Sequence, residues 1–272
     1  MGASSGMGRR VAELLASRGV RIGVAARNES ALKELKDQYP DNIEYGVIDI
    51  CKSDAPEKLE ELINSVGGMD VYIHVSGIGY DNKTLNPERE AEIINTNCTG
   101  FARMLSAAYN YFKREGIAGQ IGAVTSVAGT NGIGRLAAYS ASKKFAHTYM
   151  VALEQLSHIE NTDIQFTDIR PGWVETPLLK KGVKYPFCMD LDSAAFQILY
   201  ALAKKERVYV FDERWKCISE IWKKIPDSVW VGLNVPVTYN DMTQLFPILD
   251  SFINNNVKLP EIEKLLNSDA TE

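Results

Sequence analysis

The chain has 272 residues, 45% of them hydrophobic, which is enough to fill the core of one α/β domain or at most two. Its formal net charge of −5 argues against a general nucleic-acid surface. The four cysteines are scattered, without a C-x-x-C pair or a nearby histidine cluster, so we expect no metal site and no disulfide framework. No stretch approaches the ~20 apolar residues of a membrane span, and the first residues lack a signal-peptide core. A cytoplasmic protein is the simplest expectation.

The chain opens on a glycine-rich segment that leads into a helix. Gly2, Gly6 and Gly8 precede a stretch with apolar residues at helical spacing. Glycines at such a turn let the backbone approach a diphosphate, and the free N–H groups at the start of the helix favour negative charge. Spaced glycines alone fit an ordinary loop equally well, so the neighbouring sequence has to decide.

The residue expected to select between NAD and NADP follows the next strand. The segment 20–26 reads as a short strand, and a dinucleotide-binding fold places its specificity residue roughly twenty residues beyond the glycine turn. The sequence has Arg27 there and no carboxylate. Because an arginine can clamp a 2′-phosphate that an acidic residue would repel, we expect NADP(H), with NAD(H) as the alternative. Arg9 is either a second phosphate ligand or a solvated first-turn arginine.

Strands and helices alternate along the rest of the chain, which predicts a Rossmann-type, doubly wound parallel sheet flanked by helices. The later strands are expected at 43–50, 69–76, 120–126, 163–169 and 207–211. Helices are expected between them at 54–66, 87–113, 139–156 and 192–204. Asp49 and Ile50, at the end of one strand, are expected beside the adenine of the cofactor.

A phenol and an ammonium are spaced to lie on one face of the helix that begins near Tyr139. The four-residue step to Lys143 puts them about one turn apart. A neighbouring cation stabilises a phenolate, so we expect the pKa of Tyr139 to fall from ~10 toward neutrality. Ser126 ends an apolar run upstream, and a glycine-rich loop can return its hydroxyl to the same place. For the Y-x-x-x-K pair alone, a packed aromatic and a solvated lysine are the simpler interpretation.

Together these motifs resemble the short-chain dehydrogenase/reductase family over about residues 1–226. The family's T-G-x-x-x-G-x-G motif is matched by the three glycines of the turn, and its P-G-x-x-x-T segment by Pro171, Gly172 and Thr176. The resemblance implies four catalytic residues, namely Asn97, Ser126, Tyr139 and Lys143. The residues expected to contact the cofactor are Gly2, Ser4, Ser5, Gly6, Met7, Gly8, Arg9, Arg27, Asp49, Ile50, Ser76, Gly77, Tyr139, Lys143, Pro171, Gly172, Val174 and Thr176.

The resemblance implies hydride transfer between a nicotinamide ring and a small-molecule carbonyl or secondary alcohol, in a homodimer or homotetramer. Tyr139 would protonate the substrate oxygen, which Ser126 would hold by a hydrogen bond. Lys143 would lower the phenol's pKa and bind the nicotinamide ribose, while Asn97 would hold a water that returns the proton through Lys143. An NADPH-dependent oxidoreductase is therefore the expected function. An NAD-dependent alcohol dehydrogenase and a cofactor-binding scaffold or regulatory protein without turnover are the alternatives.

Two features depart from the family pattern. Members usually begin with an apolar strand before the glycine turn, and here Gly2 follows Met1 at once. The missing strand would be central, so we expect unpaired ladder groups beside it, and we favour an upstream start of the natural protein over a destabilised fragment. The family's N-N-A-G is replaced by H-V-S-G at 74–77, in which His74 is either structural or a substitute hydrogen-bond donor.

The segment 212–230 reads as an amphipathic helix. Apolar side chains recur at helical spacing, and lysines occupy the other faces; the apolar positions are Trp215, Ile218, Trp222 and Ile225. Such a helix can pack on the core, cover the substrate pocket or, as the least favoured interpretation, lie on a membrane surface. Several aromatic residues indicate either an apolar, bulky substrate or core packing; they are Trp173, Tyr185, Phe187 and Trp215.

The resemblance divides the chain into a catalytic domain, 1–226, and a C-terminal extension, 227–272, without an assigned role. Within the extension we expect one helix broken near Pro247 and another that starts at Pro260. Substrate identity is not readable from these motifs, because loops such as 180–189 set specificity in this fold.

Overall fold

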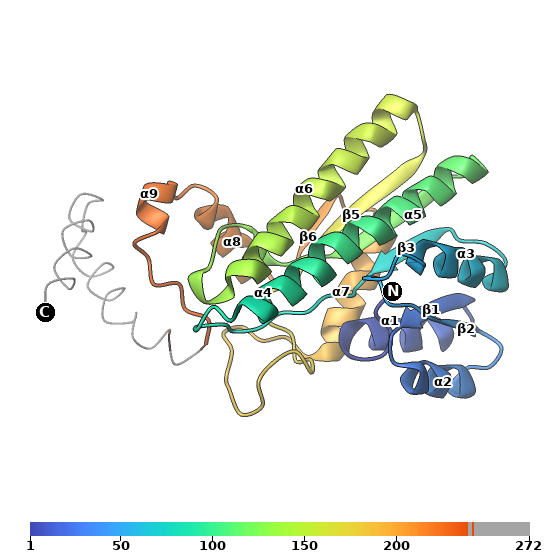
Figure 1. The fold of residues 1–272 in the computed structure, drawn as a ribbon, viewed down its shortest axis with the longest axis horizontal. Helices are drawn as coiled ribbons and strands as arrows, with labels where there is room; N and C mark the ends of the chain where they lie inside the picture. The colour runs from blue at the N-terminus through green and yellow to red at the C-terminus, as the bar shows by residue number, and fades with distance from the viewer. Residues whose placement is uncertain (239–240, 242–272) are drawn as a thin grey trace, which may run out of the picture.

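The computed structural model describes residues 1–238 and Asp241, and it contains the expected parallel sheet between two layers of helices (Figure 1). The described strands are β1 (Ile22–Ala26), β2 (Ile43–Val47), β3 (Val71–His74), β4 (Gly119–Val124), β5 (Ile164–Arg170) and β6 (Val208–Val210). Each pairs in parallel with its neighbour, in the order β1-β2 in one part of the sheet and β3-β4-β5-β6 in the other. The Rossmann-type fold class is confirmed.

Helices cover both faces of the sheet. One face carries α3 (Ala55–Val66), α5 (Phe101–Glu115) and α6 (Ala137–Glu160), and the other α1 (Gly6–Ala16), α2 (Glu29–Gln38) and α7 (Leu191–Ala203). The remaining described α-helices are α4 (Pro87–Ile94), α8 (Glu213–Trp222) and α9 (Asp227–Trp230). A strand covered on both faces is apolar on both, and five of the six residues of β4 are buried accordingly.

The described strands form two groups, and the first two residues of the chain lie between β1 and β3. The Met1 amino group donates to the carbonyl of Ile73 at 2.8 Å, and the Val75 N–H donates to the carbonyl of Met1 at 2.9 Å. On the other side, the Gly2 N–H donates to the carbonyl of Ala25 at 2.7 Å. No described strand pairs with β1 or β3 on these facing edges.

The long helical region expected at 87–113 is interrupted at its centre. A π-helical segment, Asn95–Gly100, joins α4 to α5 and contains Asn97. Gly100 allows this segment to pack closely against Ile50, which follows β2, because a Cβ at position 100 would lie 2.7 Å from Cγ1 of Ile50. Such wide turns inside α-helices are frequent at functional sites. The sequence pattern does not distinguish this turn from continuous α-helix.

The helices α8 and α9 pack over the loop that follows β4. The Trp230 indole donates to the carbonyl of Gly132 at 2.6 Å, and the Asn131 amide donates to the carbonyl of Trp222 at 2.9 Å. Trp215 and Trp230 are both 7% exposed. Since these indoles are buried in the fold, they do not provide the aromatic face of a membrane-surface helix. The breaks and helices expected near Pro247 and Pro260 lie outside the described residues.

Candidate active site

The glycine turn lies beside the end of β1 and opens α1. Gly2 and Gly6 have positive φ angles of 93° and 54°, a region that favours glycine. A Cβ on Gly8 would lie 2.2 Å from the carbonyl oxygen of Gly2, so the turn closes tightly on itself. Ser5, at the N-cap, makes no side-chain capping bond, and the first N–H groups of a helix have no intrahelical partner. The turn therefore fits an anionic group such as a dinucleotide diphosphate.

Three further residues expected at the cofactor lie around this turn. A Cβ on Gly2 would lie 2.7 Å from the backbone nitrogen of Ser76, which follows β3 together with Gly77. On Gly6, a Cβ would lie 3.5 Å from Cγ2 of Thr176. The structure therefore brings the glycine turn, the end of β3 and the loop after β5 to one place.

Other expected cofactor residues have more structural roles. Met7 is partly buried against the α7 side of the core, and Val174 is 5% exposed and forms a β-bridge with Met189. Ser4 is half-buried and Ser5 is exposed. Of these, Ser4 and Ser5 remain accessible to a ligand at the turn.

The two arginines proposed for the 2′-phosphate differ in their surroundings. Arg9 donates to both carboxylate oxygens of Glu34, at 2.7 and 3.3 Å, and to Glu13 at 3.0 Å. Hydrogen bonds to Glu34 and then Glu13 raise the pKa of Arg9 above its ordinary value. Arg27 is exposed and has no ion pair among the described residues. Arg27 is therefore the more available cation at this end of the site.

The Asp49–Ile50 pair is largely occupied by protein contacts. Asp49 Oδ1 accepts the N–H of Cys51 at 3.0 Å and so fixes the turn after β2. Ile50 is 5% exposed, and its carbonyl accepts Nη1 of Arg103 at 2.7 Å. The expected contact with adenine is therefore restricted mainly to the half-buried Asp49.

The loop after β4 brings the Ser126 hydroxyl to the phenol of Tyr139. Ser126 is 8% exposed and donates weakly to the carbonyl of Pro171 at 3.4 Å. It lies close enough to Tyr139 to lower the pKa of that phenol. The Ser126 hydroxyl and the Tyr139 phenol therefore lie near each other.

The predicted lowering of the Tyr139 pKa is wrong for this structure. Burial raises the pKa of the phenol above its ordinary value, and the Ser126 hydroxyl opposes this rise only in part. The Lys143 ammonium lies over the Tyr139 ring, with Nζ 5.6 Å from the ring centroid. It therefore contacts the aromatic face and does not act as the close cation that the one-turn spacing suggested. At neutral pH the phenol keeps its proton.

Lys143 is held in the interior and is not a solvated helix lysine. Its side chain is 8% exposed, and Nζ donates to the carbonyl of Val124, at the end of β4, at 3.0 Å. Burial lowers the pKa of Lys143 to about 8, while the negative charge of Asp168 acts in the opposite direction. A Cβ on Gly129 would lie 2.8 Å from the carbonyl carbon of Lys143, so the glycine-rich loop packs directly on α6.

Asn97 fixes the loop that follows β3. Its Oδ1 accepts the N–H of Ile78 at 2.9 Å, and its Nδ2 donates to the Ile78 carbonyl at 2.7 Å and to Ser142 Oγ at 3.0 Å. A Cβ on Gly77 would lie 3.4 Å from Asn97 Oδ1 and 3.5 Å from Lys143 Nζ. Asn97 and Lys143 therefore face the same small space beside Gly77.

His74 is a buried, neutral histidine. Its Nδ1 lies 3.0 Å from the Tyr72 hydroxyl, and its Nε2 has no hydrogen-bond partner among the described residues. Burial lowers the pKa of His74 well below its ordinary value, and the charges of the Met1 amino group and Lys143 lower it further. These contacts favour a structural role for His74 over that of a substitute hydrogen-bond donor. The loop after β3 is held by the side chain of Asn97.

Sequence reasoning missed two close contacts in this site. A Cβ on Gly172 would lie 2.1 Å from Nε1 of Trp215, and a Cβ on Gly79 would lie 2.6 Å from Cδ2 of Tyr139. The only available signal was the presence of glycine at positions where the chain leaves a strand. These glycines let Trp215 and Tyr139 lie directly against the backbone.

Aromatic side chains pack edge to face on the side of the molecule formed by the C-terminal helices. Trp215 meets Phe187 edge-on at 5.7 Å, and Trp222 meets Trp215 at 6.4 Å and Trp230 at 5.3 Å between ring centroids. Tyr139 packs, with Trp222, on the apolar cluster under the loop after β4. We call Phe187, Trp215, Trp222 and Trp230 the aromatic wall; its members come from the loop after β5 and from α8 and α9.

A cavity of about 1050 Å³ lies within the loop 175–188. Its lining is cationic at Lys180, Lys181 and Lys184 and includes Thr176, which contacts the glycine turn. Lys180 also lies 3.4 Å from the carboxylate of Asp81. Tyr139 does not line this cavity. The cavity is therefore formed by the loop after β5 and lies apart from the Tyr139 phenol.

The described residues contain no cluster of three or more His, Cys, Asp or Glu side chains suited to a metal ion. All four cysteines are free. In the part of the chain that the structure describes, no helix combines the length and apolar character needed to cross a membrane.

Known proteins share this sequence and fold. The family model for short chain dehydrogenases matches residues 1–184. An uncharacterized oxidoreductase of Myxococcus xanthus is 37% identical over 200 residues, which cover 71% of this chain and 78% of the relative. This chain therefore belongs to the short-chain dehydrogenase/reductase family and is an NAD(P)-dependent oxidoreductase.

Two solved structures are also similar. An alcohol dehydrogenase of the archaeon Thermococcus sibiricus, complexed with 5-hydroxy-NADP, is 27% identical with a TM-score of 0.64, over 77% of this chain and 92% of that one. A short chain dehydrogenase/reductase from Burkholderia phymatum in complex with NAD is 17% identical with a TM-score of 0.71, over 80% of this chain and 89% of that one. The second likeness concerns the fold alone.

Proposed function

We propose that the protein transfers a hydride between a nicotinamide cofactor, preferably NADP(H), and a small-molecule carbonyl or secondary alcohol. The observation that carries the proposal is the meeting of Ser126 and Tyr139 beside the buried ammonium of Lys143. A hydroxyl, a protonated phenol and a held cation are the groups that a carbonyl oxygen needs when it gains a proton.

The residues around the glycine turn fit the cofactor. We assign the cofactor diphosphate to the first turn of α1. Ser76 and Thr176 are assigned to the edge of this diphosphate site, because they pack around the glycine turn. Tyr139 and Lys143 are assigned to the nicotinamide end, next to Pro171 and Gly172. When bound, the cofactor supplies or accepts the hydride.

Tyr139 is the proposed acid in the reductive direction. Because burial keeps the phenol protonated at neutral pH, Tyr139 Oη has a proton to give to the substrate oxygen. Ser126 would hold that oxygen with its hydroxyl. Asn97 uses both amide hydrogens in protein hydrogen bonds, which leaves one lone pair of Oδ1 to accept from a water. This water would return a proton through Lys143.

Arg27 supports the preference for NADP(H). It is exposed, whereas Arg9 is engaged by Glu34 and Glu13. The two similar solved proteins are complexed with NAD in one case and an NADP analogue in the other, so fold similarity is neutral on this choice. A bidentate guanidinium–phosphate contact would favour NADP(H) at this position.

The aromatic wall supports an apolar or bulky substrate, since one of its members, Trp222, packs on the same apolar cluster as Tyr139. We also propose that 1–226 forms the catalytic domain and that the start of the 227–272 extension covers the site through Trp230. Phe145 on α6, which is 37% exposed and stacked on Tyr149, supports assembly into homodimers or homotetramers. The four free cysteines support a cytoplasmic location.

A carbonyl panel tests the function. The purified protein is mixed with NADPH or NADH and with aliphatic, aromatic and steroid-sized ketones and aldehydes, and cofactor oxidation is followed by absorbance. We expect turnover with at least one bulky carbonyl and a preference for NADPH. Tight NADPH binding without oxidation across the panel would favour the scaffold interpretation. Efficient alcohol oxidation with NAD and no preference for NADP would favour the NAD-dependent dehydrogenase.

A further inference from the structure

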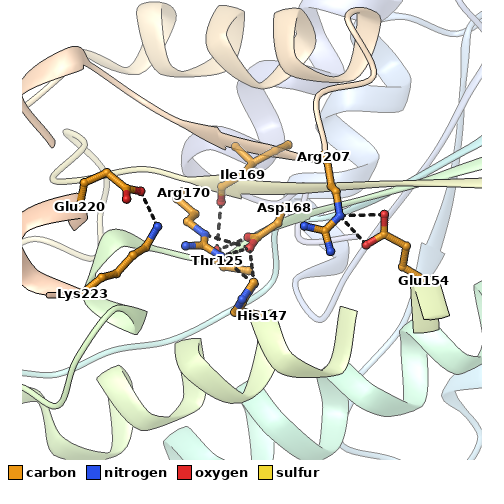
Figure 2. A network of polar contacts seen from close by, with 9 residues as sticks. All are labelled: Thr125, His147, Glu154, Asp168, Ile169, Arg170, Arg207, Glu220 and Lys223. Carbon is orange, nitrogen blue, oxygen red and sulfur yellow. Dashed lines mark hydrogen bonds and ion pairs between the residues drawn. The ribbon is translucent and has the colours of Figure 1, made fainter. Parts of the chain in front are cut away.

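A polar cluster that takes no part in the proposed chemistry joins β5 to α6 and to the segment after β4 (Figure 2). At its centre is Asp168 on β5, which is 3% exposed. Arg170 donates to Asp168 Oδ2 from Nε at 2.8 Å and from Nη2 at 2.7 Å. The same oxygen lies 2.9 Å from His147 Nδ1, and Thr125 donates to the other oxygen at 2.5 Å. One carboxylate therefore joins three segments of the chain.

Two of the three donors sit at strand ends that lead into the site. Thr125 directly follows β4 and immediately precedes Ser126. Arg170 ends β5 and immediately precedes Pro171. By binding both donors, Asp168 fixes the distance between the segment that carries the serine and the segment assigned to the nicotinamide.

The third donor belongs to the helix of the Y-x-x-x-K pair. His147 follows Lys143 by four residues on α6, so the two side chains share a helix face. Lys143 Nζ in turn donates to the carbonyl of Val124, the last residue of β4 and the neighbour of Thr125. His147 Nδ1 also lies 2.6 Å from Arg170 Nη2. When Nδ1 carries a hydrogen it donates to Asp168, and when it carries none it accepts from Arg170.

Asp168 is ionised in this environment. Burial acts to raise the pKa of its carboxyl, but the hydrogen bond to His147, the charge and hydrogen bonds of Arg170 and the hydrogen bond of Thr125 outweigh burial and lower it. A buried charge is costly even when it is paired, and such charges are concentrated at functional sites. Because the partners of Asp168 directly precede Ser126 and Pro171, this buried charge lies where it can act on the proposed active site.

We propose that Asp168 is a positioning residue of the active site. Its carboxylate fixes the strand ends that carry Ser126 and Pro171, and its negative charge balances the buried ammonium of Lys143. The inference rests on the proposed function, because the residues it positions are those assigned to hydride transfer.

Asp168 is the one described group facing Lys143 that carries negative charge at neutral pH. The titratable groups that act on or lie beside Lys143 are Asp168 on β5, Cys98 in the π-helical segment, Tyr139 on α6 and His74 on β3, which also faces the Met1 amino group. Burial raises the pKa of the Cys98 thiol and of the Tyr139 phenol, so both are neutral. His74 is also neutral.

Asp168→Asn tests the proposal without a substrate. The titration of Lys143 is followed by NMR of protein labelled with ¹³C at lysine Cε, and its resonance is identified by its absence in Lys143→Met. We expect the pKa of Lys143 to fall from about 8 by about one unit, because the opposing negative charge is gone. Glu154→Gln is the matched control, since Glu154 also lies on α6 and pairs with Arg207 at 2.8 Å (Figure 2). An unchanged titration in Asp168→Asn overturns the proposal.

His147 provides a second, milder test that does not risk the fold, because its side chain is 30% exposed. His147→Asn keeps a donor near Asp168, and His147→Leu removes it. We expect His147→Leu to lower kcat about tenfold with little change in KM, to move the alkaline limb of the kcat profile to lower pH, and to be rescued by His147→Asn. Equal kcat profiles for the two variants contradict the proposal. Absence of turnover in the unaltered protein contradicts the proposed function instead, and the NMR titration still decides the role of Asp168.

Discussion

The indole of Trp215 lies directly against the backbone of Gly172, where a Cβ would be 2.1 Å from Nε1 and 2.4 Å from Cδ1. Trp215 is 7% exposed, and its Nε1 has no hydrogen-bond partner among the described residues. The contact joins α8 to the loop assigned to the nicotinamide. The position of the C-terminal helices therefore depends on the absence of a side chain at 172.

This contact predicts that Gly172→Ala lowers stability. The added methyl has to displace a buried indole, and such overpacking typically costs ~1–3 kcal/mol. Thermal unfolding should show a lower Tm for Gly172→Ala, and Trp215→Leu should remove most of the extra loss in the double variant. Gly134→Ala is the control, because a Cβ there has nothing within 4 Å. Additive losses from Gly172→Ala and Trp215→Leu would refute the predicted clash.

Tyr139→Phe is expected to lose turnover while it keeps the fold and the cofactor. The variant removes the hydroxyl that meets Ser126 and leaves the ring under Lys143, so kcat should fall about 10²–10⁴-fold. NADPH affinity, measured by fluorescence titration, should change little. Tyr149→Phe, which loses a hydrogen bond of 2.7 Å with Ser106 and a longer one of 3.5 Å to the carbonyl of Ala102, serves as the control on the same helix. Near-normal activity of Tyr139→Phe would show that Tyr139 is not the catalytic acid.

The pH dependence of kcat should report Lys143. Because burial lowers its pKa to about 8, Lys143 loses its charge as pH rises through about 8. If the charged form is the active one, kcat falls above about pH 8, whereas an unperturbed lysine would hold its charge to ~10.4. Lys143→Arg keeps the charge throughout this range, so its alkaline limb at about pH 8 should disappear even if its maximal rate is lower. If the alkaline limb of the kcat profile stays at the same pH in Lys143→Arg, the limb reports the titration of another group.

Arg27→Ala should weaken the preference for NADPH over NADH. Loss of a charge-assisted contact to a phosphate is worth about 1.5–3 kcal/mol, or roughly a tenfold to hundredfold change in relative affinity. Affinities for both cofactors are measured by titration, and NADH affinity should be little altered. Arg18→Ala, two residues beyond the C-terminal end of α1, is a matched loss of an exposed arginine that donates to the carbonyl of Leu14. An unchanged affinity ratio in Arg27→Ala would remove the argument for NADP(H).

Local spacing in the sequence predicted most of the fold. The alternation of apolar runs and amphipathic segments located the strands and helices to within a few residues, because burial on both faces of a parallel sheet leaves a direct pattern in the chain. The expected long helix at 87–113 failed at its centre, since a π-helical turn depends on the close approach of Gly100 to Ile50 and not on helical periodicity.

The candidate site was predicted less completely. The sequence paired Tyr139 with Lys143 because residues four apart share a helix face, and it anticipated that Ser126 would return to them. It did not anticipate the raised pKa of Tyr139, which comes from burial by distant segments. Nor did it indicate that Glu34 would bind Arg9, because the two belong to different helices.

The sequence alone determined the element order, the glycine turn and the one-turn pairing on α6, since each depends on residues that are near one another in the chain. Only the tertiary structure decided the electrostatics. The buried carboxylate of Asp168 gathers donors from the ends of β4 and β5 and from α6, and Trp215 reaches Gly172 across the molecule. Burial and long-range charge act through space, so their effect on Lys143 and Tyr139 appears only when the chain is folded.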